Sequence, residues 1–559
     1  MKFDLKEKKM SLSMVIIVIL CLIVTGIIVV TIANQVGADA TQPWFIQQTL
    51  DTHEPVKLEN SYIISNEEDV LKFVHNKEIY TIEGKLSDDF CGVADILVEN
   101  GKIARVYAKP DITSGTIQRY TDVNIEIMET EDENTTQNLT RKTKVPVYKV
   151  TNGTVQEIEW DVMILGTTAV NAVMEEGQVA ALIIDEEVVP TDIRVLLRNG
   201  DSIFRSDVYV KKMYENTIVR VNEVLSNNNE SSITLSDKNG LVLCDASGNP
   251  LGEAYEGEFT IIKTEQGFVI INKLPIETYL KYVIPSEMPK TFAHEALKAQ
   301  AVCARTYAYS QMENGAYAQY GANLDDTTDY QVYHSFGRYT ETDAAVEETK
   351  GEIITYNGQL ITCYYFSTCS GVTNDFSVWG DSTAAYISMK GLEEVKDLDL
   401  TKKADFSKYM SSSYETNDMD SPYYRWKSTL NIETEKETVY GKLKAIKVVK
   451  RNAAGYVTEL LMDYEKKDIT LTKENDIRKA LGIYHKETTL NDGQKRTELS
   501  MIPSACFEVL ETSDDTITLR GGGYGHGIGL SQYGANKMAQ KDYNYKEIIQ
   551  YYYSGVAVE

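Results

Sequence analysis

Short segments in which hydrophobic and polar residues alternate dominate the first third of the chain. Such runs lie at 80–84, 94–110, 144–150 and 179–190. Alternation with a period of two predicts strands with one buried face, and the Asn-Gly dipeptides at 100–101 and 152–153 favour tight hairpins. An acidic, polar stretch near 129–140 is expected to be a loop. Residues 41–190 are therefore predicted to form a small β-rich accessory region.

An uncharged apolar run precedes this region. Residues 14–33, MVIIVILCLIVTGIIVVTIA, have the length that a helix needs to cross a bilayer. Lysines come before the run and the next basic residue after it is Lys57, which predicts a cytoplasmic N-terminus. The alternative is a signal peptide cleaved near Ala38-Asp39-Ala40, but the run exceeds the usual length of a signal-peptide core. We expect residues 1–40 to be a cytoplasmic stub and a membrane anchor. The protein would then be a single-pass protein of the cell membrane, with the residues after the anchor outside the cytoplasm.

The pattern changes from alternating to helical after residue 275. A second β-rich stretch runs from 193 to 275, and apolar residues then recur at helical spacing from Ile276 to Ile284. Pro285 is expected to end this helix. Residues 292–312 predict a long helix whose alanines occupy more than one face, which indicates burial on several sides.

Further strands are expected at 351–368 and 444–451, and a short helix at 474–482. The predicted fold class is α+β: an N-terminal transmembrane helix, the β-rich accessory domain, and a larger α+β domain over 191–559 with a β core and a long buried helix.

The charge and composition of the chain argue against a nucleic-acid partner. The formal net charge is −27, without the basic stripe that nucleic-acid binding requires. Tyrosine is abundant, with 36 residues against 13 phenylalanines, which suits a surface that stacks on sugars and equally a wet β-rich surface. The cysteines outside the apolar run form no CxxC pair, so we expect free and mostly buried thiols.

Glycine alternates with other residues in RGGGYGHGIGLSQYGA, residues 520–535. In a strand, Gly523, Gly525, Gly527 and Gly529 would leave one face bare, while Tyr524 and His526 would line the other. A bare face admits either a polymer or another stretch of backbone, and the spacing does not decide between them.

Glu287 stands out in IPSEMP, residues 284–289, in an expected link between two helices. One interpretation is a surface residue favoured by the dipole at the next helix N-terminus, which lowers a carboxyl pKa. The other is a general acid whose pKa is raised by apolar neighbours. The sequence alone does not decide between these two interpretations.

Two further stretches carry candidate chemistry. Asp329 and His334 lack the spacing of metal ligands, so no metal and no cofactor are expected. Ser367 or Cys369 could be a nucleophile with His526 as its base, but no nucleophile elbow supports this hydrolase. The aromatic cluster SPYYRW, residues 421–426, and Trp379 suit sugar stacking and core packing equally.

The order of these segments is similar to that of the sporulation stage II protein D family, which includes amidase-enhancer proteins of the bacterial cell wall. The resemblance covers roughly 190–559 and is carried by a run of motifs: YLKYVIPSEMPKTFAHEALKAQAVCARTYAY, QVY, YFSTCSG, VWG, SPYYRW, IRKALG, GYGHGIGLSQYGANKMA and YKEIIQYYYSG.

The resemblance implies a peptidoglycan lytic transglycosylase that cuts glycan strands between N-acetylmuramic acid and N-acetylglucosamine, preferably after an amidase has removed the stem peptides. The family's catalytic glutamate corresponds to Glu287, a single general acid and base. We expect His526, Gln532, Tyr533, Ser367 and Arg305 to bind substrate. The glycine face would then let a glycan lie against bare backbone.

This sequence departs from the family pattern at the position of a zinc site. Some family members carry His and Cys zinc ligands just before Gln-Val-Tyr, whereas here Asp329 and Tyr330 precede Gln331. We therefore expect no structural zinc at this place. The alternative function is a non-catalytic glycan-binding activator of a cell-wall amidase.

Overall fold

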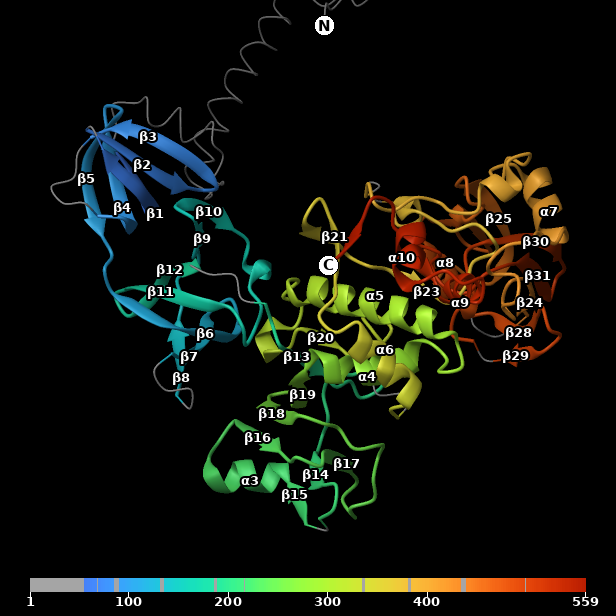
Figure 1. Ribbon diagram of the computed structural model, residues 1–559, viewed down its shortest axis with the longest axis horizontal. Helices are drawn as coiled ribbons and strands as arrows, with labels where there is room; N and C mark the ends of the chain where they lie inside the picture. The colour runs from blue at the N-terminus through green and yellow to red at the C-terminus, as the bar shows by residue number, and fades with distance from the viewer. Residues whose placement is uncertain are drawn as a thin grey trace, which may run out of the picture. The chain divides into compact units, whose positions relative to one another are not determined.

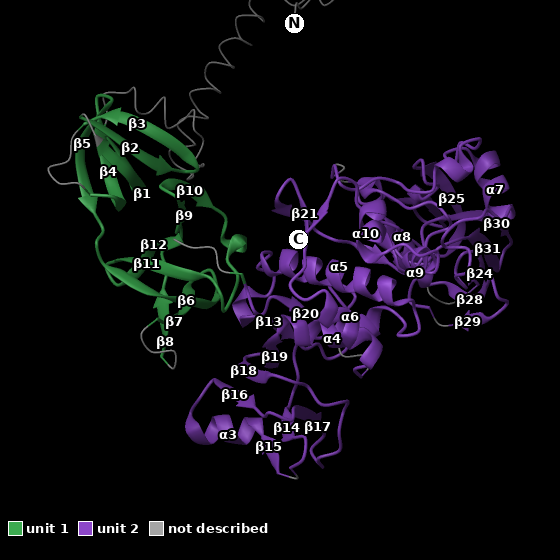
Figure 2. Cartoon of the chain, viewed as in Figure 1, with its two compact units in different colours: residues 1–189 green, residues 190–559 purple. Residues whose placement is uncertain are grey.

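The computed structural model describes residues 55–559, except for short gaps at 68, 85–89, 131–134, 185–188, 216, 334–336, 381–383, 434–438 and 498. The apolar run 14–33 and the possible cleavage site at 38–40 lie outside the described residues. Within the described part of the chain, no helix is both long and apolar enough to cross a membrane. The chain divides into two compact units, residues 1–189 and 190–559 (Figure 2).

The first unit is built from two antiparallel-rich sheets with the strand orders β3-β2-β1-β4-β5 and β10-β9-β12-β11-β6-β7-β8 (Figure 1). The strands are β1 (Val56–Glu67), β2 (Val70–His75), β3 (Glu78–Glu83), β4 (Gly92–Glu99), β5 (Lys102–Ala108), β6 (Ile112–Tyr120), β7 (Asn124–Glu129), β8 (Thr136–Thr140), β9 (Val147–Thr151), β10 (Thr154–Ile158), β11 (Ala169–Glu175) and β12 (Gln178–Ile184).

Both Asn-Gly dipeptides form the predicted hairpins. Asn100 and Gly101 join β4 to β5, and Asn152 and Gly153 join β9 to β10, all four with positive φ. This conformation matches the twist of the flanking strands, which is why the dipeptide predicts it. The loop predicted near 129–140 is wrong in part, because Thr136–Thr140 forms the edge strand β8 beside β7.

The second unit begins with a five-stranded sheet in the order β16-β18-β19-β13-β20. Its strands and the small elements inserted among them are β13 (Asp192–Leu196), β14 (Tyr209–Lys212), β15 (Ile218–Arg220), α3 (Val221–Asn228), β16 (Ser232–Ser236), β17 (Leu241–Cys244), β18 (Glu258–Thr264), β19 (Gly267–Pro275) and β20 (Leu324–Asp325). Strand β19 runs directly into helix α4 (Ile276–Glu287).

The predicted long helix is confirmed as α5 (His294–Met312), and almost every residue from Ala296 to Ala308 is buried. Small side chains on all faces allow α4, α6 (Thr340–Glu348), α9 (Gln532–Ala539) and α10 (Tyr545–Tyr552) to pack against it (Figure 1). Helix α5 is thus the centre of the helical layer.

The remaining residues form another five-stranded sheet, in the order β29-β28-β24-β31-β30, several smaller sheets and short helices. They comprise β21 (Ile354–Tyr356), β22 (Gln359–Leu360), β23 (Tyr365–Phe366), α7 (Lys403–Ser411), β24 (Trp426–Asn431), β25 (Leu443–Arg451), β26 (Val457–Tyr464), β27 (Ile469–Leu471), α8 (Glu474–Gly482), β28 (His485–Leu490), β29 (Lys495–Thr497), β30 (Phe507–Thr512), β31 (Thr516–Gly521), β32 (Leu530–Ser531) and β33 (Ala557–Val558). The predictions for 444–451 and 474–482 are confirmed, whereas the stretch 351–368 holds three very short strands. The eight described helices and many strands confirm the α+β class.

Five of the six cysteines outside the apolar run are buried and all six are free, as expected; only Cys91 is exposed. The parallel pair β23–β32 joins two distant segments, 364–369 and 529–534, beside α5. This junction positions the candidate site.

Candidate functional site around Glu287

Glu287 is the last residue of α4, not part of a link between helices. The helix continues through Pro285, which lies in its last turn, and Met288 N–H donates to Ile284 O at 2.8 Å. The expectation that Pro285 ends the helix is therefore wrong. The end of a helix carries partial negative charge, so the local dipole disfavours an ionised Glu287, the opposite of the effect at a helix N-terminus.

Glu287 is half-buried, and its carboxyl group is closely surrounded by protein. Its Oε1 accepts a hydrogen bond from Val332 N–H at 2.9 Å, and the side chains of Tyr365 and Gln532 also hydrogen-bond to it. Burial raises the pKa of Glu287 to about 7, because these three donors only partly offset the loss of water around the charge. The interpretation with a raised pKa is the one that the geometry supports.

The residues of Gln-Val-Tyr hold this arrangement in place. Gln331 donates from Nε2 to Tyr365 Oη at 3.0 Å and to Ala304 O at 3.2 Å, and its Oε1 accepts from Tyr279 Oη at 3.2 Å. Gln331, Ala304 and Tyr279 are buried and Tyr365 is half-buried, so the orientation of the Tyr365 hydroxyl toward Glu287 is fixed by a satisfied network. Sequence reasoning did not select Tyr365 or the Val332 N–H, although both lie in motifs that carry the family resemblance, YFSTCSG and QVY.

Gln532 and Tyr533 are the first two residues of α9. Gln532 is buried, bonds to Glu287 and donates to Gln300 Oε1 at 3.4 Å. Tyr533 is half-buried and packs edge-on against Phe292, with ring centroids 5.1 Å apart. Its N–H donates to Ser367 O at 3.0 Å, so Ser367 contributes a backbone group that fixes Tyr533. Substrate contacts of Gln532, Tyr533 and Ser367 stay predictions.

The alternating glycines do not form a strand with a bare face open to solvent. Gly523, Gly525, Gly527 and Gly529 all have positive φ, between 80° and 111°. A Cβ on Gly529 would lie 2.0 Å from Tyr364 O, and one on Gly525 would lie 2.8 Å from Phe366 Cβ. The glycines therefore let segment 523–529 pack against the backbone of 364–369, and the expectation of a glycan lying on a glycine face is wrong.

His526 is held as a neutral ring with both nitrogens engaged. Nδ1 accepts from Ile528 N–H at 3.0 Å, so the proton sits on Nε2, which donates to Tyr365 O at 3.1 Å. Burial lowers the pKa of His526 to about 4. His526 thus holds the backbone of Tyr365, and its expected contact with substrate stays a prediction.

The geometry does not support the alternative of a hydrolase with His526 as base and Cys369 as nucleophile. His526 has no nitrogen left to accept a proton, and Cys369 is buried with its pKa raised well above the usual range by loss of solvation. A protonated, buried thiol is a poor nucleophile.

Arg305 does not face the site. Its side chain is fully buried in α5, where it makes a bidentate ion pair with Glu277 at 2.9 and 2.7 Å. The guanidinium also donates to the carbonyl oxygens of Glu352 and Val346. These contacts tie α4, α6 and the segment after α6 to α5, so the prediction that Arg305 binds substrate is wrong and its role is structural.

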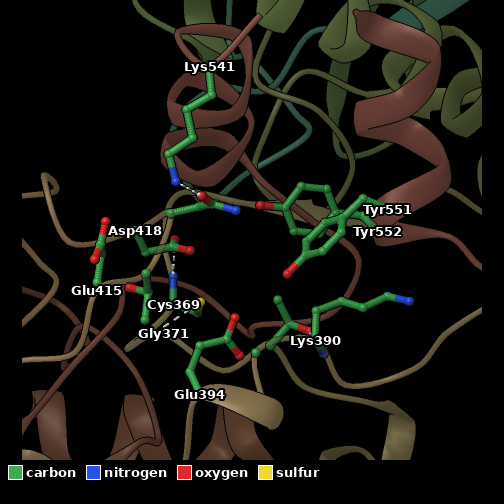
Figure 3. A pocket seen from close by; sticks show the side chains of 13 residues that line it. Cys369, Gly371, Lys390, Glu394, Glu415, Asp418, Lys541, Tyr551 and Tyr552 are labelled. Atoms are coloured by element: carbon green, nitrogen blue, oxygen red, sulfur yellow. Dashed lines mark hydrogen bonds between the residues drawn. The ribbon is translucent and has the colours of Figure 1, made fainter. Parts of the chain in front are cut away.

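Asp418 ties together the two segments of the strand junction. It accepts from Thr368 Oγ1 at 2.8 Å, from Cys369 N–H at 2.9 Å and from the Ser531 hydroxyl, and burial raises its pKa. A polar pocket of about 100 Å³ lies beside it, with Glu394, Glu415 and Lys541 on its wall (Figure 3). Lys541 donates to Asn417 Oδ1 at 3.0 Å there. Glu287 is not among the residues that line this pocket.

Among the described residues, no group of three or more His, Cys, Asp or Glu side chains is arranged to hold a metal ion. His334, considered above as a ligand, lies outside them. The chemistry available at the site is therefore that of one carboxyl group with a raised pKa, tyrosine hydroxyls and amides.

Two family models match segments of this chain. The family model described as stage II sporulation protein matches residues 264–356, which include Glu287 and Val332, and a model for a domain of unknown function matches 375–529. The chain is 31% identical over 306 residues to stage II sporulation protein D of Bacillus subtilis, covering 52% of this chain and 75% of that protein.

The same protein of Bacillus amyloliquefaciens is 30% identical over 302 residues, which cover 52% of this chain and 75% of the relative. The amidase enhancer of Bacillus subtilis is 32% identical over 301 residues; these cover 50% of this chain and only 40% of the enhancer's length. With these relatives and the matched model, this chain belongs to the sporulation stage II protein D family.

Proposed function

We propose that this protein is a lytic transglycosylase that cuts peptidoglycan glycan strands between N-acetylmuramic acid and N-acetylglucosamine, with Glu287 as its single acid and base. The observation that supports this most directly is the half-buried carboxyl group with a pKa of about 7, held by Val332 N–H, Tyr365 and Gln532. A carboxyl group with this pKa is protonated in part of the molecules at neutral pH, yet it is also able to act as a base.

The proposed reaction uses both states in turn. Protonated Glu287 donates its proton to the glycosidic oxygen while the bond to muramic C1 breaks. The resulting carboxylate then accepts the proton of the muramic 6-hydroxyl as that oxygen bonds to C1, which yields a 1,6-anhydro ring and restores the acid. Because the substrate supplies the nucleophile, the second carboxylate of ordinary glycosidases is not needed.

We further propose that the reaction takes place outside the cell membrane, with the apolar run 14–33 as anchor. The lack of Lys and Arg between that run and Lys57 supports this orientation. The acidic net charge of −27 gives no support to a nucleic-acid partner.

A second candidate function is the activation of a cell-wall amidase without catalysis. It is favoured by one observation, the similarity of half of this chain to a protein named amidase enhancer. Activation requires no proton transfer by Glu287, so Glu287→Gln separates the two functions.

The deciding experiment incubates peptide-stripped peptidoglycan with the full-length chain and analyses the products by mass spectrometry. We expect anhydro-muramyl ends with the wild type and with the exposed control variant Glu265→Gln, and none with Glu287→Gln. Absence of cleavage by a folded, glycan-binding wild type, together with stimulation of an amidase by both it and Glu287→Gln, would favour the activator instead.

A further inference from the structure

Two tyrosine rings from distant segments stack face to face on the surface of the second unit. The rings of Tyr423 and Tyr524 have centroids 4.5 Å apart and planes 19° apart. Tyr524 keeps 37% of its surface exposed, and Tyr423 is half-buried. A large aromatic ring left exposed and already ordered by stacking is typical of a surface that receives a ligand.

The backbone of Tyr524 is held rigidly. Its N–H donates to Thr368 O at 2.7 Å, its carbonyl accepts from Thr368 N–H at 3.2 Å, and Gly523 N–H donates to Tyr423 O at 2.8 Å. The positive φ of Gly523 and Gly525 turns the chain on both sides of Tyr524. Since the ring is fixed before any ligand arrives, binding to it loses little conformational entropy.

The stacked pair lies close to the Glu287 site. Thr368 follows Tyr365, which bonds to Glu287, by three residues, a span of at most about 10 Å. The backbone N–H of Tyr533 donates to Ser367 O at 3.0 Å, and Ser367 adjoins Thr368, whose backbone pairs with that of Tyr524. The aromatic surface therefore begins within the reach of a short oligosaccharide that occupies the site.

We propose that Tyr423, Tyr524 and Tyr533 form a sugar-binding subsite that receives a pyranose ring of the glycan strand beside the ring that is cut. This inference rests on the proposed function. A pyranose ring presents C–H groups on its faces and hydroxyl groups at its edge, which match the apolar face and polar edge of tyrosine. Arg496, which hydrogen-bonds to Tyr423, adds a cationic donor at the rim for a hydroxyl or carboxylate of the ligand.

The test measures affinity in the Glu287→Gln background, where cleavage is not expected to consume the ligand. The full-length chain is titrated by calorimetry with peptide-free oligosaccharides of alternating N-acetylglucosamine and N-acetylmuramic acid. Tyr524→Ala and Tyr524→Leu should each weaken binding by roughly tenfold, because both remove the ring face. Tyr524→Phe keeps the ring and should stay within about twofold of the parent. Tyr214→Ala, at a tyrosine that is 77% exposed, is the control.

The outcomes separate the subsite from the proposed function. Unchanged affinity in folded Tyr524→Ala and Tyr524→Leu, with anhydro ends still made by the wild type, would overturn the subsite alone. Weakened binding with no cleavage by the wild type would uphold the subsite and reject the transglycosylase. If the parent binds no oligosaccharide and Tyr524→Ala abolishes stimulation of an amidase, the stacked pair is a protein-docking surface and the inference is overturned.

Discussion

Val332 donates its backbone N–H to Glu287 Oε1 at 2.9 Å across 45 positions of the chain. A main-chain donor is kept with every residue except proline, so one oxygen of the carboxyl group is held in place by the backbone and not by the Val332 side chain. The Tyr365 and Gln532 side chains complete the hydrogen bonding of the carboxyl group. These three neighbours and the burial of Glu287 together set the pKa of its carboxyl group.

The first prediction concerns pH and stability. The pKa of Glu287 in the folded protein, about 7, lies above its ordinary value of 4.5, so the folded state holds the proton more tightly than the unfolded state. Stability should therefore fall as pH rises from about 4.5 through 7, by up to about 3 kcal/mol from this group. Glu287→Gln stays neutral and removes this loss.

Denaturant unfolding of both proteins across this pH range measures the effect. We expect equal stability near pH 4.5 and a more stable Glu287→Gln variant at pH 9. A stability difference between the two that does not change with pH would show that the pKa of Glu287 is not raised.

The second prediction concerns the hydroxyl of Tyr365. This hydrogen bond lowers the pKa of Glu287, so Tyr365→Phe should raise that pKa further and move the alkaline fall of the cleavage rate to higher pH. The rate itself should drop by roughly tenfold, because the carboxyl group loses a positioning contact.

Tyr333→Phe is the matched control for this variant. The Tyr333 hydroxyl is also buried, but it donates to Asn272 Oδ1 at 2.8 Å. It should cost stability without moving the pH profile. Equal shifts in the two variants would mean that the Tyr365 effect is a general loosening of the core.

The third prediction compares two causes of lost stability when a glycine is replaced: a clash of the new Cβ with neighbouring atoms, and strain of the backbone at a positive φ. Gly529→Ala brings a Cβ to 2.0 Å from Tyr364 O at a φ of +80°, and we expect a loss of about 3 kcal/mol or more. Gly493 has a similar φ of +82° but nothing within 4 Å, so Gly493→Ala should cost only about 1 kcal/mol. Urea unfolding measures both losses. Similar losses would mean that the chain of 364–369 moves aside easily.

The fourth prediction concerns Arg305. Arg305→Met leaves Glu277 without its cationic partner, so the free energy of unfolding should fall by roughly 3–5 kcal/mol. The double variant Arg305→Met with Glu277→Gln should recover part of this loss. If Arg305→Met instead weakens glycan binding at unchanged stability, Arg305 binds substrate after all.

The sequence by itself determined the local elements of this protein. The alanines and apolar residues of 292–312 predicted α5, and the Asn-Gly dipeptides predicted two hairpins, because both signals depend on neighbours a few residues apart. Glu287 could be selected from IPSEMP and the family resemblance. Its environment could not be predicted, because the sequence did not show that the helix carrying it continues past Pro285.

Tertiary structure decided the rest, because the contacts that matter join segments far apart in the chain. Alternating glycines give the same sequence pattern in an extended strand and in a chain with repeated left-handed residues, and only the packing of 523–529 on 364–369 selects the second. A buried arginine and a substrate-binding arginine also look alike until Glu277 is found beside it. The pKa of Glu287 depends on donors from Val332, Tyr365 and Gln532 and on the protein packed around it, and no short stretch of sequence contains them together.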